Sequence, residues 1–159
     1  MTAVPTSPRS SVAGLLVFGA AVAAVAVVGA IAAGSAGTQY QQLRLPPWAP
    51  PSWLFGPVWT ALYVLIAVSG WLVWRRRGLG PAMVLYAAQL LLNAAWTPLF
   101  FAAREYGLAL VDIVVLLVAV VVLTGWFFRL HRVAGALLVP YALWVGYATA
   151  LNAAIVVLN

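Results

Sequence analysis

The chain has 159 residues, of which 66% are hydrophobic and only 6% are charged, and its mean hydropathy is +1.08. This composition excludes an ordinary soluble domain, in which about a quarter of the residues are charged, and indicates that lipid surrounds most of the chain. The net charge of +6 does not indicate a nucleic-acid-binding protein, because the arginines are scattered between apolar runs instead of forming one basic face.

Five apolar runs follow a polar amino-terminal segment, and each has about the 20 residues that a helix needs to cross a bilayer. We expect helices throughout, because an open sheet in lipid leaves its edge unpaired and these runs are too long and too uniformly apolar for barrel strands. The sequence therefore predicts an all-α integral membrane bundle of five transmembrane helices, forming one domain over residues 1–159. The runs cover residues 12–34, 53–74, 81–103, 106–128 and 133–158.

The first run, residues 12–34, shares features with a secretory signal, since a basic residue precedes it and small residues close it. It exceeds the usual signal core of about 7–15 residues, so we favour a retained helix. Ala26, Ala30 and Gly34 recur every four residues in it, a spacing that lets another helix approach closely. This stripe of small residues is a weak signal for a homodimer.

Prolines and aromatic residues dominate the long first loop, residues 35–52, and the start of the second run. Two proline pairs within residues 46–51 hold the backbone extended or turned, because proline fixes its own φ and disfavours helix in the residue before it. The second helix is therefore expected to begin near Ser52 or Trp53. An aromatic stripe then follows at four-residue steps on one face of that helix: Phe55, Trp59 and Tyr63.

A polar face runs along the third predicted helix, where Gln89, Asn93 and Thr97 recur every four residues and Trp96 lies beside them. One interpretation is hydrogen bonding between helices, at about 0.6 kcal/mol for each bond. The other is a polar wall that faces a ligand, and the sequence does not show which helix lies opposite. Pro98 is expected to bend the helix and to free a carbonyl one turn earlier.

Two acids and one histidine are the candidates for proton chemistry. Glu105 and Asp112 lie about 10 Å apart along a helix, too far to share a proton. Asp112 lies inside its run, so we expect it to face the bundle, in a structural hydrogen-bond network rather than in proton coupling. His131 is expected in a solvated loop, with haem ligation as a remote alternative. A single histidine and no cysteine predict no protein metal site.

Three tryptophans, Trp59, Trp96 and Trp144, lie deep within three different runs. Such a set suits a flat, polycyclic ligand better than an ion, because the indole rings offer large flat apolar surfaces. The tryptophans nearer the ends of their runs are typical of an interfacial belt: Trp53, Trp74 and Trp126.

The arginines orient the predicted bundle. Six of the eight lie in the amino-terminal tail, the second loop and the fourth loop, whereas Arg44 and Arg104 lie on the other side. The positive-inside rule therefore predicts that the amino terminus and the second and fourth loops lie inside. The long first loop and the carboxyl terminus are expected on the opposite face.

Three segments resemble the signature segments of the TspO/MBR family, which includes bacterial tryptophan-rich sensory proteins and the mitochondrial translocator protein. They are residues 45–63 (LPPWAPPSWLFGPVWTALY), 92–112 (LNAAWTPLFFAAREYGLALVD) and 140–152 (PYALWVGYATALN), and they occur in the family's order. The resemblance implies a five-helix bundle, usually homodimeric, in a bacterial cell membrane or, in eukaryotic members, the outer mitochondrial membrane; we favour the bacterial one. It also implies a pocket under the first loop for protoporphyrin IX, haem-related tetrapyrroles, sterols or benzodiazepine-type ligands.

The resemblance also implies roles for particular residues. Trp59 and Trp144 match the tryptophans implicated in the family's light- and oxygen-dependent breakdown of bound porphyrin. The cholesterol-recognition stretch of the animal relatives falls where this chain has Ala153 and Val157, so sterol handling through that stretch is not expected. The ligand-binding residues implied by motif position are Tyr40, Trp48, Phe55, Trp59, Tyr63, Asn93, Trp96, Thr97, Trp144, Ala148 and Leu151.

The leading hypothesis is a membrane receptor or regulator whose ligand is a porphyrin or another flat hydrophobic molecule, with no cofactor required and no nucleic-acid partner. The ligand is expected to enter between helices or under the first loop and to stack on Trp59 and Trp144, while Tyr40 and Trp48 close over it. One alternative is an enzyme that photo-oxidises bound porphyrin through these tryptophans. Another is a porphyrin or sterol transporter, which is less favoured because no inverted repeat or pair of broken helices is visible.

Overall fold

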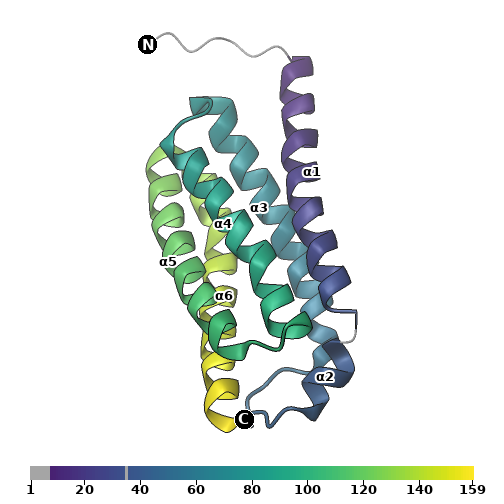
Figure 1. Cartoon of the computed structure of the whole chain (residues 1–159). Coiled ribbons are helices and arrows are strands. Elements are labelled where there is room, and N and C mark those ends of the chain that lie inside the picture. Colours follow the sequence, from purple (N-terminus) through teal and green to yellow (C-terminus); the bar gives the residue numbers. More distant parts are fainter. Residues whose placement is uncertain (1–7, 35) are drawn as a thin grey trace.

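The computed structural model describes residues 8–34 and 36–159, and these residues are almost entirely helical (Figure 1). A one-turn 3-10 helix, η1 (Ser52–Leu54), precedes α3, and a π-helical turn, η2 (Pro98–Ala102), follows α4. The α-helices are α1 (Pro8–Ala32), α2 (Ala36–Gln42), α3 (Phe55–Arg77), α4 (Pro81–Thr97), α5 (Tyr106–Leu130) and α6 (Arg132–Leu158).

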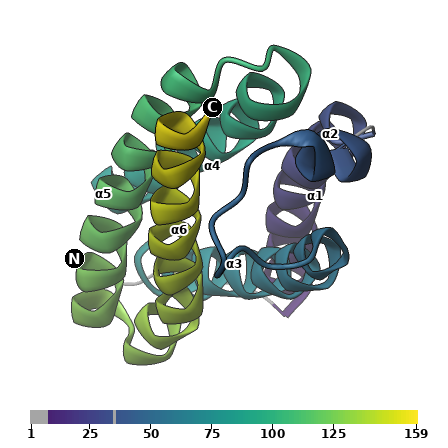
Figure 2. The same ribbon diagram turned by 90° about the horizontal axis from the view of Figure 1, so that it is seen from below.

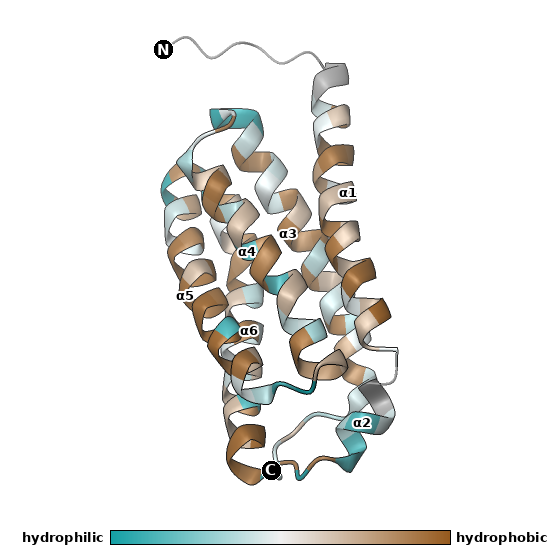
Figure 3. Ribbon diagram, viewed as in Figure 1, coloured by the Kyte–Doolittle hydropathy of each residue, from teal (hydrophilic) through white to brown (hydrophobic). Residues whose placement is uncertain are grey.

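Five segments of the described chain are helical, long enough and apolar enough to cross a membrane, which confirms the predicted all-α membrane bundle. Figure 3 shows hydrophobic residues along their length, with hydrophilic stretches at α2 and at the α3–α4 connection. The five segments are Ser11–Ala32, Ser52–Arg77, Pro81–Ala102, Tyr106–Leu130 and Arg132–Leu158.

The long helices form a ring in which chain neighbours are not always spatial neighbours (Figure 2). Helix α1 packs on α3 and α4, α3 packs on α6, and α5 packs on both α4 and α6, whereas α3 and α4 make few contacts with each other. Because α3 and α4 diverge, α1 closes one side of the gap between them and the α5–α6 pair closes the other.

The α5–α6 pair is the most closely packed part of the bundle. At their connection, a Cβ atom added to Gly135 would lie 2.6 Å from the backbone nitrogen of Phe128, so only glycine permits this approach. Among the residues of the pair with 0% exposure are Val120, Leu123, Phe127, Leu138, Tyr141 and Val145.

Some helix boundaries differ from the predicted ones. Helix α3 begins at Phe55 after the short η1, as the prolines predict, but it continues to Arg77, because arginine is a good helix former and its charge is favourable at a helix carboxyl end. The loop predicted over residues 35–52 contains α2, a correction to the sequence analysis, and Ser35 lies outside the described residues. Pro98 opens the π-helical turn η2, so the expected disturbance of the helix occurs there.

Candidate ligand-binding site

A cavity of about 450 Å³ lies between α1, α3 and α4, at the end of the bundle that carries α2. This volume is within the range of about 300–1,000 Å³ typical of small-molecule sites. Aromatic side chains from α2, α3, α4 and η2 form most of its wall: Tyr40, Phe55, Trp59, Tyr63, Trp96 and Phe101.

Helix α1 contributes only small residues to the cavity, namely Ala26, Gly29 and Ala30, and Ala33 follows in the turn after it. A Cβ atom on Gly29 would lie 3.6 Å from the hydroxyl oxygen of Thr97, so a larger side chain there would extend into the cavity. Ala26 and Ala30 belong to the small-residue stripe that was a weak dimer signal in the sequence. In the structure these two residues leave room inside a single chain.

The cavity is open on one side of the bundle. Ala30 of α1 and Gly56 and Thr60 of α3 line it and are also exposed, so its mouth lies between these two helices. The side of a transmembrane bundle faces lipid. An apolar ligand could therefore reach the aromatic wall from the bilayer without crossing the first loop.

The aromatic stripe of α3 connects the cavity to α6. The rings of Trp59 and Tyr63 have centroids 5.3 Å apart, and the Trp59 ring lies 6.3 Å from that of Tyr141 in an edge-to-face arrangement. The ring centroid of Phe55 lies 5.4 Å from that of Tyr40 and 6.0 Å from that of Trp144, and both pairs are edge to face. These rings hold one another in place, because aromatic pairs at such distances attract through their quadrupoles.

Trp96 is fixed at the inner wall of the cavity by a hydrogen-bond relay. Its indole Nε1 donates to Oδ1 of Asn152 at 3.2 Å, and the side-chain amide of Asn152 donates to the carbonyl of Tyr106 at 3.0 Å. The relay joins α4, α6 and the start of α5, and it satisfies the buried indole N–H.

A second polar network runs from the cavity wall into the bundle. The hydroxyl of Tyr63 donates to Oδ1 of Asn93 at 3.1 Å, Nδ2 of Asn93 donates to the hydroxyl of Tyr141 at 2.9 Å, and that hydroxyl donates to Oε1 of Gln89 at 2.8 Å. Gln89 and Asn93 therefore bond between helices, while Thr97 lines the cavity. Hydrogen bonding between helices, the first interpretation of this polar face, therefore applies to Gln89 and Asn93. The second interpretation, a polar wall that faces a ligand, fits the position of Thr97.

The first loop is fastened over this end of the bundle. The hydroxyl of Tyr40 donates to the carbonyl of Pro50 at 3.0 Å, and the hydroxyl of Tyr147 donates to the carbonyl of Trp48 at 2.9 Å. Burial, with a smaller contribution from Tyr147, raises the pKa of Tyr40 to about 12. The phenol of Tyr40 therefore stays protonated at neutral pH and remains a donor.

The carboxyl terminus completes the fastening of the loop. Asn159 accepts from the backbone N–H of Arg44 at 3.0 Å and donates to the carbonyl of Arg44 at 3.1 Å. The loop is thus tied to α6 at two points, at Trp48 and at Arg44.

The structure brings together six of the eleven ligand-binding residues implied by the sequence. These are Tyr40, Phe55, Trp59, Tyr63, Trp96 and Thr97. The other five are placed outside the cavity wall: Trp48, Asn93, Trp144, Ala148 and Leu151.

The two displaced tryptophans have distinct environments. Trp48 is 48% exposed, and its ring centroid lies 5.7 Å from that of Tyr147 in an edge-to-face arrangement. Trp144 touches the rear of the wall through Phe55, and its buried Nε1 has no hydrogen-bond partner among the described residues. Of the two tryptophans expected to stack on one ligand, Trp59 therefore lines the cavity, whereas Trp144 contacts a residue of its wall.

The sequence analysis missed part of the cavity wall. Ser52 of η1 and Gly56 and Thr60 of α3 line it and recur every four residues, so they form a small and polar stripe beside the aromatic one. That periodicity was a usable signal. Phe101 of η2 also lines the cavity, and it gave no comparable signal because the π-helical turn breaks the helical period.

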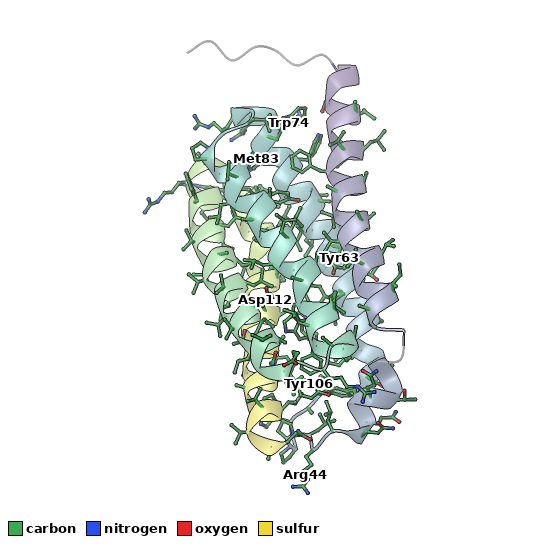
Figure 4. The ribbon with its side chains drawn as sticks, in the orientation of Figure 1. Arg44, Tyr63, Trp74, Met83, Tyr106 and Asp112 are labelled. Atoms are coloured by element: carbon green, nitrogen blue, oxygen red, sulfur yellow. The ribbon has the colours of Figure 1, made fainter. Side chains whose placement is uncertain are left out.

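The remaining candidates lie away from the cavity. Asp112 lies on α5 in the half of the bundle nearer α2, well apart from Tyr63 in Figure 4, and its buried Oδ2 has no partner among the described residues. His131 is not a free loop residue: its Nδ1 accepts from the N–H of Ala134 at 3.3 Å and caps α6. Across residues 8–34 and 36–159 no group of three or more metal-ligating side chains occurs.

Comparison with known proteins places the chain in a family. The sequence profile of the TspO/MBR family matches residues 16–158. The tryptophan-rich sensory protein of Cereibacter sphaeroides is 41% identical over 113 residues, covering 71% of this chain and 72% of that protein. The translocator protein of Homo sapiens is 41% identical over 118 residues, covering 71% and 70%. The tryptophan-rich protein TspO of Chlorobaculum tepidum is 39% identical over 128 residues, covering 78% and 81%. The chain therefore belongs to the TspO/MBR family.

Proposed function

We propose that the chain is a membrane receptor or regulator that binds tetrapyrroles such as protoporphyrin IX, and other flat hydrophobic molecules, in the cavity between α1, α3 and α4. The observation that supports this most directly is an aromatic cavity of about 450 Å³ with a mouth on the lipid side. Membership of the TspO/MBR family supports it as well, because the resemblance implies a pocket near these residues.

The chemistry of the wall suits a flat ring system. Phe55, Trp59 and Tyr63 offer ring faces and edges from one side, and the small residues of α1 leave a space opposite them. No charged side chain occurs among the described lining residues. The carboxylates of a porphyrin are therefore expected at the α2 end of the cavity, near water, because an unpaired carboxylate is costly inside it.

The decisive experiment compares two leucine substitutions on the same helix. Gly29→Leu places a side chain in the cavity, whereas Gly19→Leu places one where a Cβ atom would meet nothing within 4 Å. Protoporphyrin IX is titrated in the dark into detergent-purified protein while porphyrin absorbance is followed. We expect Gly29→Leu to weaken binding by about tenfold or more and Gly19→Leu to leave it unchanged. Wild-type affinity in a folded Gly29→Leu variant would show that the porphyrin binds elsewhere.

Photo-oxidation of bound porphyrin is a second candidate, favoured by one observation: Trp59 lines the cavity. Illumination of the porphyrin complex in air tests it by the rate of porphyrin bleaching. Because Trp144 lies behind Phe55, Trp59→Phe should slow bleaching more than Trp144→Phe. Equal rates in wild type and Trp59→Phe would exclude a role for this tryptophan.

We also propose that the end of the bundle opposite α2 faces the inside of the cell. Arg75, Arg76 and Arg77 end α3 there, whereas Arg44 lies at the α2 end, as the positions of Trp74 and Arg44 in Figure 4 illustrate. The positive-inside rule supports this orientation. Because the chain has no cysteine, Leu79→Cys and Pro47→Cys give single thiols at opposite ends. A membrane-impermeant maleimide added outside intact cells should label position 47 only.

A further inference from the structure

Two grooves meet on the outer surface of the bundle at the end opposite α2. One, of about 420 Å³, is lined by Arg76, Arg129, His131 and Arg132, among others. The other, of about 430 Å³, runs along α5 past Val121, Val122, Gly125 and Trp126. Arg129 and Leu130 line both grooves, so a polar groove continues directly into an apolar one.

The polar groove gathers cations from three helices. Arg76 lies in the last turn of α3, Arg129 in the last turn of α5 and Arg132 at the start of α6, and all three are exposed. Asp112, the nearer of the chain's two acids, lies about 25 Å from Arg129 along α5. The arginines therefore have no carboxylate nearby, and guanidinium groups bind phosphate oxygens well.

The start of α6 adds to the positive potential of this groove. His131 accepts the N–H of Ala134 through its side chain and that of Gly135 through its carbonyl. The N–H groups of Arg132 and Val133 precede these and have no intrahelical partner by the geometry of a helix start. The amino end of this 27-residue helix thus attracts an anion alongside the arginines.

The apolar groove lies on the outer side of α5, where a lipid chain would lie. Val121, Val122, Gly125 and Trp126 lie on one outward face of α5, because they follow at three- and four-residue steps. A Cβ atom on Gly125 would meet nothing within 4 Å, so the missing side chain leaves an open trough. From Arg129 to Val121 the trough extends about 12 Å towards the middle of the span.

We propose that the two grooves together bind one anionic phospholipid. Its phosphate lies among Arg76, Arg129 and Arg132, and one acyl chain lies along Gly125 beside the Trp126 ring. A phospholipid has its anionic headgroup at the end of the span and its acyl chain directed into the membrane, which matches the order of the polar and apolar grooves. Free phosphate would occupy only the polar groove. The site is separate from the cavity and does not depend on the proposed porphyrin binding.

The headgroup part of the proposal is tested by native mass spectrometry of the detergent-purified protein with added lipid. Phosphatidylglycerol and phosphatidylcholine with identical chains are compared, and we expect retained phosphatidylglycerol at lower lipid concentration. Arg129→Gln should weaken its binding about fivefold, and Arg44→Gln, an exposed arginine at the other end, should not. Equal binding of the two lipids, or equal effects of the two variants, would overturn the proposal.

The chain part of the proposal is tested by Gly125→Leu, with Gly107→Leu as its control. Both glycines lie on α5, and a Cβ atom added to either would have nothing within 4 Å, so the two positions are matched. Gly125→Leu should weaken phosphatidylglycerol binding while Gly107→Leu does not. Equal effects of the two leucines would show that the acyl chain does not lie along Gly125. Displacement of the lipid by millimolar inorganic phosphate would show a site for free anions. Loss of a dimer in Gly125→Leu without loss of bound lipid would show a contact between copies instead.

Discussion

Helix α1 and the α5–α6 pair pack in opposite ways, and the difference explains where the cavity lies. Residues of the α5–α6 pair such as Phe127, Leu138 and Tyr141 have no exposed surface. In the described part of α1, by contrast, just two hydrophobic residues are buried, Val22 and Val25. Helix α1 is held closely at the end opposite α2, where a Cβ atom on Gly14 would lie 2.2 Å from the Trp74 ring. At its other end small residues face aromatic rings across an open space.

This contrast shows that the bundle combines a rigid half with a looser half. Close packing fixes the positions of side chains, because a fully packed core has no room for even one additional methylene group. The α5–α6 pair thus supports the rear of the aromatic wall through Tyr141 and Trp144. Small residues on α1 leave a volume that lipid or a ligand can occupy. Substitutions in the close-packed half should therefore change mainly stability, and substitutions in the looser half should change mainly ligand binding.

The largest effect on stability is expected at Gly135 in the close-packed half. An alanine Cβ atom there would lie 2.6 Å from a backbone atom of Phe128, which cannot move aside, so Gly135→Ala should lower the free energy of unfolding by about 3 kcal/mol. Gly146→Ala on the same helix is the control, because its Cβ atom would make an ordinary 3.8 Å contact with Leu117. Thermal unfolding in detergent measures both, and equal midpoints would contradict the close approach.

A loss of binding without a comparable loss of stability is expected at Trp59 in the looser half. Removing the ring in Trp59→Ala should weaken protoporphyrin IX binding by about thirtyfold, because the ring provides a large part of the stacking surface. Trp126→Ala serves as the control, since that ring is 36% exposed on the outer side of α5. Equal losses in the two variants would mean that the cavity is not the binding site.

Tyr141 connects the two halves, so its hydroxyl should matter to stability in an intermediate way. Tyr141→Phe removes the bonds to Asn93 and Gln89 and should cost about 1 kcal/mol, because each bond between helices in a membrane contributes about 0.6 kcal/mol. Tyr63→Phe removes one bond and should cost about half as much. A larger cost for Tyr63→Phe than for Tyr141→Phe would show that the network is centred on the cavity wall.

The smallest effect is expected where the first loop meets the carboxyl terminus. Asn159→Ala removes the two bonds to Arg44, which are exposed to solvent, so global stability should fall by about 0.5 kcal/mol or less. Hydrogen exchange should nevertheless become faster in residues 43–49, because the loop loses one of its two ties to α6. Unchanged exchange there would mean that the bond between Tyr147 and Trp48 is sufficient to hold the loop.

Much of the candidate site could be predicted from the sequence where a local rule applied. The prolines before residue 52 set the start of α3, and the four-residue spacing of Phe55, Trp59 and Tyr63 put all three rings on the cavity wall. The spacing of Gln89, Asn93 and Thr97 correctly put them on one face of α4. It did not show that Asn93 bonds to Tyr141 while Thr97 borders the cavity, because that depends on which helix lies opposite each turn.

The sequence by itself determined the five transmembrane helices, since apolar runs of this length must satisfy their own backbone hydrogen bonds in lipid. Only the tertiary structure decided that α1 supplies one wall of the cavity, that Trp144 lies behind Phe55, and that His131 caps α6. The order of helices in the ring and the rotation of each helix about its axis come from packing between residues far apart in the chain. Local periodicity identifies the faces of a helix but contains no information about its neighbours.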